Sequence, residues 1–280
     1  MRAVLDEGSL ADLIGRWPAE HSAVAVVGVD GSVRRAGDVD REFRLASVSK
    51  PLGALAILVA VEEETVGLED PAGPPGSTLR HLLAHASGLA FDGDRVLAPP
   101  RTRRIYSNTG VEVAAAHLEA AAGVPFGTYQ REAVFDRLGM TRTELRGSPA
   151  SEVVSVVDDL VRVAHELLAP TLLHPSTMEE ATSPVFPELA GVLPELGRFD
   201  PNPWGLGFEV RGHKQPHWTG TRNSPATFGH FGGSGTFLWV DPVAGLACIG
   251  VTDRNFGRWA IEAWPALSDT VLAALSPDGR

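Results

Sequence analysis

Lysine, tyrosine and cysteine are scarce in this sequence. Two lysines, Lys50 and Lys214, stand against 22 arginines, and there are two tyrosines and one cysteine. The single cysteine, Cys248, excludes an internal disulfide, and its place in the apolar run 245–251 predicts a buried small hydrophobe rather than a nucleophile. A lysine inside a motif is therefore informative in a chain that otherwise uses arginine for its cations.

The sequence also lacks an excess of positive charge. It has 24 lysines and arginines against 35 aspartates and glutamates, for a net charge of −11. Binding to nucleic acid or to an anionic membrane surface requires a basic face. The arginines are scattered apart from Arg101, Arg103 and Arg104, so neither nucleic acid nor a membrane is expected as a partner.

Long hydrophobic runs are missing as well. The longest, 52–61, is about half of what a membrane-spanning helix needs. Asp6 and Glu7 come before any apolar stretch, so the N-terminus does not resemble a secretory signal, and we expect a cytoplasmic protein. The length of 280 residues, with 44% hydrophobic and 21% charged residues, suits a single globular domain.

Periodicity places strands at both ends of the chain and helices in the middle. Asp30-Gly31 between two β-rich runs predicts a hairpin. Ser9 is a candidate helix N-cap. The expected helices are 9–16, about 52–63, 79–85, 111–122, 126–138, 153–168 and 259–275, and the expected strands are 23–29, 32–35, 204–210, 235–240 and 246–251.

This order predicts an α+β fold in which both chain ends form one antiparallel sheet flanked by helices, with a mostly helical insertion. We expect one catalytic domain over 1–280, with an α/β part at about 1–64 and 188–280 and a helical part at about 65–187. A site would lie between the two parts.

The pair Ser47-x-x-Lys50 precedes the apolar helix. Pro51 fits there because the first turn of a helix needs no N–H from it. Residues three apart share a helix face, so the hydroxyl and the amine lie side by side. Arginine could not replace Lys50 as a base, because a guanidinium does not deprotonate in a protein. Taken alone, the pair could be a helix-capping serine and a surface lysine, although the apolar run that follows counts against this alternative.

Two further motifs offer polar groups. Tyr106-x-Asn108 places a phenol and an amide on one side of an extended loop, where they could also be a turn tyrosine and a capping asparagine. The run 229–235, Gly-His-Phe-Gly-Gly-Ser-Gly, lies just before a strand, and its glycines would let a substrate approach the backbone closely. By itself this run could be a loose glycine hairpin.

Together and in this order, the three motifs resemble the active site of serine β-lactamases and penicillin-binding proteins. More narrowly, the chain resembles the class C β-lactamase-related branch, which includes DD-peptidases and esterases. The resemblance runs almost the full length, through framework segments without catalytic chemistry: 79–89, 138–140 with Thr143, Ser155 with 158–160, and 204–208.

The resemblance implies a role for each matched residue. Ser47 would be the acylated nucleophile, Lys50 its base, Tyr106 a second proton carrier that serves the leaving group, and Asn108 a holder of Lys50 and the substrate. The substrate-binding wall would be His230, Phe231, Gly232 and Gly233, with the N–H groups of Ser47 and Gly233 as the oxyanion hole. Whether Lys50 or Tyr106 takes the first proton stays open at this stage.

The third motif departs from many penicillin-recognising relatives, which carry lysine and then a hydroxyl residue where this chain has His230 and Phe231. A histidine is mostly neutral at pH 7, and phenylalanine has no hydroxyl, so carboxylate recognition should be weak there. Phe231 could instead line an apolar acyl pocket. This favours an esterase acting on a small-molecule ester or amide over a β-lactamase or D-alanyl-D-alanine carboxypeptidase; a catalytically quiet binding module is the second alternative.

No cofactor or metal is expected. His81 and His85 are spaced i, i+4, but no nearby acidic residue completes a metal site, and the segment matches the family framework. His165-Glu166 likewise lacks the second histidine of a zinc motif. The oligomeric state is not encoded in any feature of the sequence.

Overall fold

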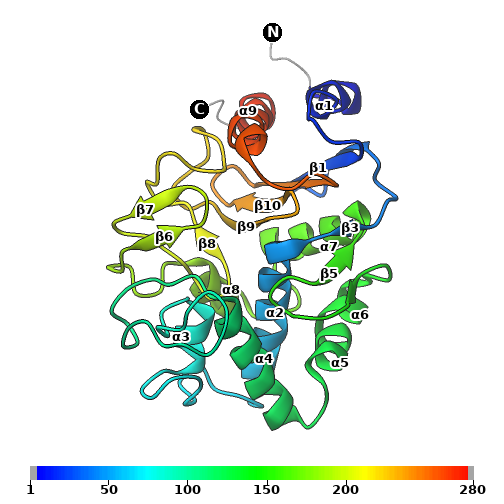
Figure 1. Ribbon diagram of the computed structural model, residues 1–280. Coiled ribbons are helices and arrows are strands. Elements are labelled where there is room, and N and C mark those ends of the chain that lie inside the picture. Colours follow the sequence, from blue (N-terminus) through cyan, green and yellow to red (C-terminus); the bar gives the residue numbers. More distant parts are fainter. Residues whose placement is uncertain (1–4, 277–280) are drawn as a thin grey trace.

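Both ends of the chain build the central sheet (Figure 1). The structure, a computed structural model, describes residues 5–276. The strands are β1 (Ser22–Gly28), β2 (Val33–Gly37), β8 (Glu209–Val210), β9 (Phe228–Gly232), β10 (Thr236–Asp241) and β11 (Leu246–Thr252). Their order is β2-β1-β11-β10-β9-β8, and every neighbouring pair is antiparallel. The predicted α+β class, with a sheet made from both chain ends, is confirmed.

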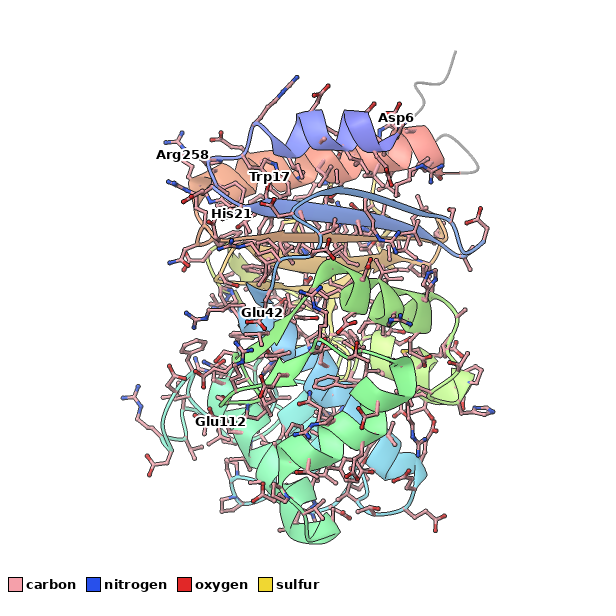
Figure 2. The ribbon with its side chains drawn as sticks, turned by 90° about the vertical axis from the view of Figure 1, so that its right-hand side faces the viewer. Asp6, Trp17, His21, Glu42, Glu112 and Arg258 are labelled. Carbon is pink, nitrogen blue, oxygen red and sulfur yellow. The ribbon has the colours of Figure 1, made fainter. Side chains whose placement is uncertain are left out.

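Strand β1 shows why helices cover both faces of this sheet. Ala23, Ala25 and Val27 belong to the core cluster that contains helices α2 (Ser49–Glu62) and α7 (Val157–Leu168), whereas Val24 and Val26 belong to a second cluster with α1 (Glu7–Ile14) and α9 (Arg258–Leu275). Both sets of side chains are buried, so the strand carries no polar side chain after Ser22, its first residue. Figure 2 shows α1 and α9 side by side over the outer face, with the remaining helices below the sheet.

Helix α2 lies in the middle of the helices below the sheet and is buried from Ser49 to Ala60. Around it lie α3 (Leu79–Leu83), α4 (Asn108–Ala122), α5 (Phe126–Gln130), the π-helical turn η2 (Arg131–Phe135), α6 (Asp136–Leu138) and α8 (Pro175–Thr182). Two small sheets complete the fold: β3 (Phe43–Arg44), β5 (Val153–Ser155) and β4 (Glu144–Leu145) form one, and β6 (Gly191–Leu193) and β7 (Gly197–Phe199) the other. Among residues 5–276, no helix is both long and apolar enough to cross a membrane.

Most predicted elements are confirmed. The hairpin around Asp30-Gly31 forms between β1 and β2, and Gly31 has the positive φ of 83° that this turn requires. Gly123 ends α4 with φ 72°, as the sequence predicts. The stretch 126–138 is helical throughout, although its middle turn is a π-helix.

Three local predictions are wrong. Asp6, not Ser9, caps α1, because its carboxylate accepts hydrogen bonds from both the N–H and the hydroxyl of Ser9. The predicted helix 153–168 begins only at Val157, because the β-branched residues before it form β5 and pair with β3. In the predicted strand 204–210, only β8 is extended, because Gly207 turns the chain with φ 86°.

Candidate active site

Ser47 lies in the 3-10 turn η1 (Ala46–Val48), which leads directly into α2. Ala46 has a φ of 45°, a conformation that costs a non-glycine residue free energy and that recurs where a catalytic side chain must be held out of the regular backbone. Ser47 is half-buried, and Lys50 Nζ lies 3.2 Å from its Oγ. The structure therefore brings together the two side chains that the motif predicts on one helix face.

Lys50 is 2% exposed, and its amine makes three hydrogen bonds. Nζ donates to Ser47 Oγ at 3.2 Å, to Asn108 Oδ1 at 2.7 Å and to the Ala150 carbonyl at 2.9 Å. Burial lowers the pKa of Lys50 from 10.5 to about 7, although the charges of Asp92 and Glu112 act in the opposite direction. At neutral pH the amine is thus available in both its charged and its neutral form.

Asn108 connects Lys50 to an acidic residue outside the motifs. Its Oδ1 accepts from Lys50, and its Nδ2 donates to Asp92 Oδ1 at 3.0 Å. Asn108 is the first residue of α4, and Ser107 is the N-cap. The expectation that Tyr106-x-Asn108 lies in an extended loop is therefore wrong at Asn108, which is helical. The N-cap hydrogen bond from Gly110 N–H to Ser107 Oγ fixes the start of the helix.

Tyr106 lies between Lys50 and His230. Lys50 Nζ is 4.7 Å from the centroid of the Tyr106 ring, and the Tyr106 hydroxyl is 3.4 Å from His230 Nε2. Burial raises the pKa of the Tyr106 phenol well above its usual value, and the hydroxyl of Ser47 only partly opposes this. The phenol therefore stays protonated at neutral pH.

His230, on β9, is a neutral side chain of known tautomer. Burial and the charge of Lys50 lower its pKa to about 3, although the hydrogen bond to the Phe231 carbonyl and the charge of Glu209 act in the opposite direction. Its Nδ1 is 2.6 Å from the Phe231 carbonyl, which can only accept, so Nδ1 carries the proton. Nε2 is therefore the acceptor for the Tyr106 hydroxyl.

The turn after β9 is fastened to the segment that carries Ser47. Ser234 Oγ donates to the Arg44 carbonyl at 2.7 Å, and Thr236 Oγ1 donates to the Leu45 carbonyl at 2.7 Å. At Gly232 a Cβ would lie 2.4 Å from the Leu45 carbonyl oxygen, so this close approach requires glycine. The run 229–235 is thus the end of β9 and the tight turn that leads into β10, so it lies just before a strand as predicted, and the alternative of a loose glycine hairpin does not hold.

Two N–H groups near Ser47 Oγ have no acceptor among the residues that the structure describes. Within the described part of the chain, neither Ser47 N nor Gly233 N makes a hydrogen bond. Ser47 and Gly233 line the same cavity, which also contains His230 and Phe231. These N–H groups fit the oxyanion hole that the sequence resemblance implies.

The cavity beside Ser47 has a volume of about 370 Å³. Its aromatic wall consists of Phe91, Tyr106, Trp204, Phe231 and Phe256. The rings of Phe231 and Phe256 pack with centroids 4.9 Å apart, so Phe231 lines the cavity as an apolar surface.

A buried ionic network behind this cavity carries no motif and was missed from the sequence. Glu209, on β8, accepts hydrogen bonds from His217 Nε2 and Trp218 Nε1, each at 3.1 Å, and forms an ion pair with Lys214. Burial raises the pKa of Glu209, but Lys214 and His217 outweigh burial, and the net pKa lies below its usual value. Both lysines of the chain are therefore buried close to the site.

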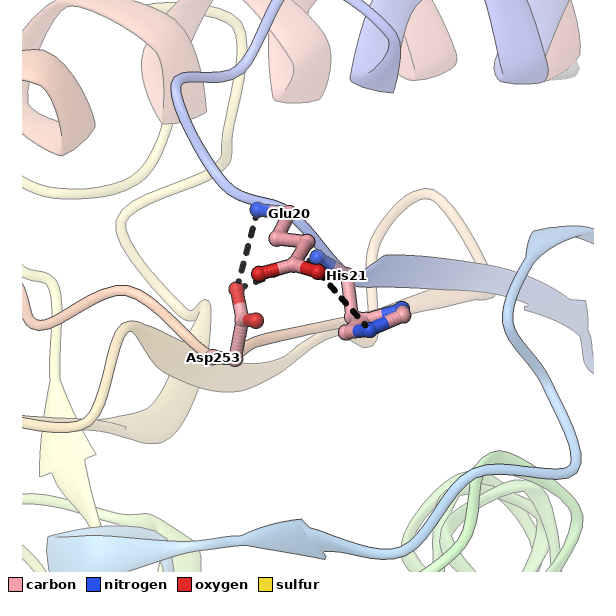
Figure 3. A group of neighbouring side chains, drawn as sticks. All are labelled: Glu20, His21 and Asp253. Atoms are coloured by element: carbon pink, nitrogen blue, oxygen red, sulfur yellow. Dashed lines mark hydrogen bonds and ion pairs between the residues drawn. The ribbon is translucent and has the colours of Figure 1, made fainter.

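Metal-ligating side chains do not gather at Ser47. Over residues 5–276, the cluster with donor atoms close enough for an ion is Glu20, His21 and Asp253, on the strand ends (Figure 3). Asp253 Oδ1 already accepts the N–H groups of Glu20 and His21, at 3.2 and 3.1 Å, which explains its position structurally. His81 and His85 have structural hydrogen bonds. His81 Nδ1 accepts from the N–H of Thr78, and His85 Nδ1 accepts from the N–H of Ser107.

Comparison with known proteins gives a family and a fold. The model of the Beta-lactamase family matches residues 10–271. The crystal structure of a beta-lactamase from Mycobacterium bovis is 51% identical, covers 95% of this chain and 98% of its own, and superposes with a TM-score of 0.93. Simvastatin synthase from Aspergillus terreus has a TM-score of 0.79 at 16% identity, over 95% of this chain and 93% of its own, and shows the fold alone.

Similarity to curated proteins is more local. Penicillin-binding protein 4* of Bacillus subtilis is 30% identical over 136 residues, which are 37% of this chain and 30% of that protein. A glutaminase from Aeromonas hydrophila is 32% identical over 88 residues, which are 29% of each chain. The matches thus span about 30% of the length of these curated relatives, and they give no activity for the whole chain.

Proposed function

Because this chain belongs to the beta-lactamase family of serine hydrolases, we propose that it forms an acyl-enzyme on Ser47 and acts mainly on small esters. The observation that carries the proposal is the position of Lys50, which is buried, close to Ser47 Oγ, and has a pKa of about 7. A hydroxyl becomes a good nucleophile when an adjacent base takes its proton. A lysine with an ordinary pKa of 10.5 would be almost fully protonated and could not do so at neutral pH.

In the acylation step, neutral Lys50 accepts the proton of Ser47 as Oγ bonds to the ester carbonyl carbon. The carbonyl π electrons move to its oxygen, which the N–H groups of Ser47 and Gly233 would stabilise. When the bond to the leaving oxygen breaks, the proton returns from Lys50 by way of the Tyr106 hydroxyl to that oxygen. Water then repeats the sequence on the acyl-enzyme and releases the acid.

The environment of Tyr106 supports Lys50 as the first base. Within residues 5–276, Lys50 is the cation next to the phenol, because burial lowers the pKa of His85 and of His230, the two histidines that pack against the Tyr106 ring. His230 orients the hydroxyl by accepting from it and adds no charge that would favour a tyrosinate. We therefore assign Tyr106 to proton transfer and to the leaving group rather than to the first deprotonation.

Esters are favoured over β-lactams and peptides with a terminal carboxylate by the charges of the cavity. Its ionisable lining residues other than Tyr106 and His230 are Glu195 and Glu209, and no arginine or lysine is among the lining residues. A substrate carboxylate would meet the exposed carboxylate of Glu195 and no lining cation beside the third motif, where many penicillin-recognising relatives carry a lysine; the charge of Glu209 is already paired with Lys214. The second candidate is a β-lactamase, which is favoured by the 51% identity to the M. bovis protein described as a beta-lactamase.

The test compares the native protein with Ser47→Ala on four substrates: p-nitrophenyl acetate, p-nitrophenyl butyrate, a chromogenic cephalosporin and a D-Ala-D-Ala peptide. We expect ester turnover and stoichiometric fluorophosphonate labelling in the native protein, and neither in Ser47→Ala. Persistent labelling of Ser47→Ala would refute the nucleophile. Cephalosporin or peptide turnover far above ester turnover would refute the ranking, and no turnover or labelling at all would favour a catalytically quiet module.

A further inference from the structure

A second cavity, of about 580 Å³, adjoins the catalytic one. Phe91, Tyr106 and Pro194 line both cavities, so the two share a wall. The second cavity lies between the loop that follows α3 and the β6–β7 hairpin, which Figure 1 shows next to each other. Backbone contacts join the two segments: Arg104 N–H donates to the Ala190 carbonyl at 2.8 Å, and Arg104 bridges to Gly191.

The two cavities differ in the charged residues that line them. The catalytic cavity is lined by Glu195, by Glu209, which is paired with Lys214, and by no arginine or lysine. The second is lined by Arg103, Arg104 and Arg198 and by no aspartate or glutamate. In a chain with a net charge of −11, this is a local reversal of sign directly beside the nucleophile.

Arg104 is a buried cation beside the second cavity, and the four carbonyls that its guanidinium contacts belong to residues outside the cavity lining. It is 2% exposed, and its guanidinium donates to the carbonyls of Asn202, Ala84, Val185 and Phe186 at 3.1, 2.5, 2.8 and 3.0 Å. Carbonyls satisfy the hydrogen bonds but leave the charge uncompensated, and no carboxylate lies within ion-pair distance among residues 5–276. Burial lowers the pKa of Arg104 to about 10, so it stays cationic at neutral pH.

The rim of the second cavity combines cationic and apolar side chains. Arg103 and Arg198 are exposed, and neither forms an ion pair with a carboxylate in the described part of the chain. Phe91, Leu97 and Val192 are 49%, 37% and 56% exposed, which is unusual for large hydrophobic residues. The lining thus matches a ligand that has an apolar stem and an anionic end.

We propose that the second cavity binds the leaving group of the substrate, and that this leaving group is an apolar alcohol ending in a carboxylate or a phosphate. The proposal rests on the proposed function, in which Tyr106 returns the proton to the leaving oxygen. That oxygen must therefore lie against Tyr106. Tyr106 lines both the catalytic cavity and the second cavity, so a group attached to that oxygen lies next to the second cavity. The acyl part stays on the Phe231 and Phe256 side, and the anion is held by arginines rather than at the third motif.

The test measures kcat/KM for acetate esters of hexanol, 6-hydroxyhexanoate and 6-hydroxyhexyl phosphate, which differ only in the end of the alcohol. The proteins are the native chain, the double variant Arg103→Gln/Arg198→Gln, and Arg222→Gln as a control that removes an exposed arginine elsewhere. We expect the native protein to prefer the anionic esters. Each of the two arginines should account for about a twofold to fivefold preference. The double variant should lose this preference while hexyl acetate turnover stays unchanged.

A binding measurement separates this proposal from the catalytic one. Titration calorimetry of hexyl phosphate and 6-hydroxyhexanoate into Ser47→Ala needs no chemistry, and the two probes distinguish a phosphate end from a carboxylate end. Binding to Ser47→Ala that weakens in Ser47→Ala/Arg103→Gln/Arg198→Gln supports the cavity even if no ester is hydrolysed. Equal kcat/KM for the anionic and neutral esters, unchanged in the double variant, would overturn the proposal while leaving ester hydrolysis on Ser47 intact.

Discussion

The ionisation of Lys50 gives the sharpest test of the proposed chemistry. Its pKa of about 7 lies well below the ordinary 10.5. This difference corresponds to about 5 kcal/mol of free energy against the charged form, at 1.36 kcal/mol per pKa unit. About half of the Lys50 side chains are then neutral at pH 7, against about one in 3,000 for a lysine with an ordinary pKa. We therefore expect kcat/KM for p-nitrophenyl butyrate to rise with pH and to level off above a midpoint near 7.

Two carboxylates allow this midpoint to be moved without touching the reacting groups. Asp92 and Glu112 both raise the pKa of Lys50 by their charge. Asp92→Asn keeps an oxygen that can accept from Asn108 Nδ2, and Glu112→Gln keeps an acceptor for the Ser148 hydroxyl. Removing either negative charge makes the protonated amine less stable, so the midpoint should fall to lower pH in each variant and further in the double variant.

The measurement is kcat/KM between pH 5 and 9, together with the pre-steady-state release of p-nitrophenol, which reports acylation directly. Asp12→Asn, on the outer helix α1, removes a charge of the same sign far from Lys50 and should leave the midpoint in place. Lys50→Arg keeps a positive charge but cannot act as a base, so its rate should fall about 10²–10⁴-fold and lose the rise near pH 7. A native profile that is flat from pH 5 to 9, or a midpoint that ignores both carboxylates, would refute Lys50 as the base.

Three further outcomes follow from other contacts. Tyr106→Phe removes the hydroxyl that lies 3.4 Å from His230 Nε2 and should lower ester kcat about 10²–10⁴-fold while keeping the midpoint near pH 7; loss of the midpoint would make Tyr106 the base. Glu209→Gln leaves Lys214 and His217 buried without a carboxylate and should lower the free energy of unfolding in urea by about 3–5 kcal/mol. The control Glu195→Gln, at an exposed residue, should change it by less than about 0.5 kcal/mol. Equal effects of the two variants would contradict a stabilising network around Glu209. Gly207 has a φ of 86°, and a Cβ at this position would lie 2.2 Å from the Cβ of Ala54 on α2. Gly76 has a similar φ of 80° but open space around it, so Gly207→Ala should lower the thermal midpoint of unfolding more than Gly76→Ala. An equal loss in both variants would show that backbone strain alone matters.

The proximity of Ser47 and Lys50 could be predicted from the sequence because it depends on local spacing. Ser47 and Lys50 share the start of one helix, so three residues of separation place their side chains together. The apolar runs at both chain ends likewise predicted the strands that pair in the sheet. Where a local pattern fits two structures, the prediction failed: the β-branched start of 153–168 fits a buried helix as well as a strand, and only its pairing with β3 decides.

The partners that tune the site were not predictable in the same way, because they are contacts between distant segments. Lys50 donates to the carbonyl of Ala150, 100 residues away, and any residue type can offer a carbonyl. Asp92 reaches Asn108 across 16 residues from a loop without a motif. Glu209, Lys214 and His217 lie within nine residues of one another, but nothing in their spacing shows that all three are buried. Burial, rather than residue type, is what gives these groups their effect.

Three of the buried cations show why position 50 needs a lysine. Arg104 is surrounded by carbonyls and keeps its charge, because a guanidinium retains its proton even when burial lowers its pKa. Lys214 is buried against Glu209, whose carboxylate stabilises the ammonium that burial disfavours. Lys50 has a carbonyl, an amide oxygen and a hydroxyl around its amine but no carboxylate in contact, so burial acts on it with little compensation. Of the three, Lys50 alone can lose its proton near pH 7, and it is the one next to a serine hydroxyl.

An arginine at position 50 would hold a permanent charge, as Arg104 does, and a carboxylate against Lys50 would stabilise its ammonium, as Glu209 does for Lys214. The site therefore requires both the lysine and the absence of an acidic partner in contact with it.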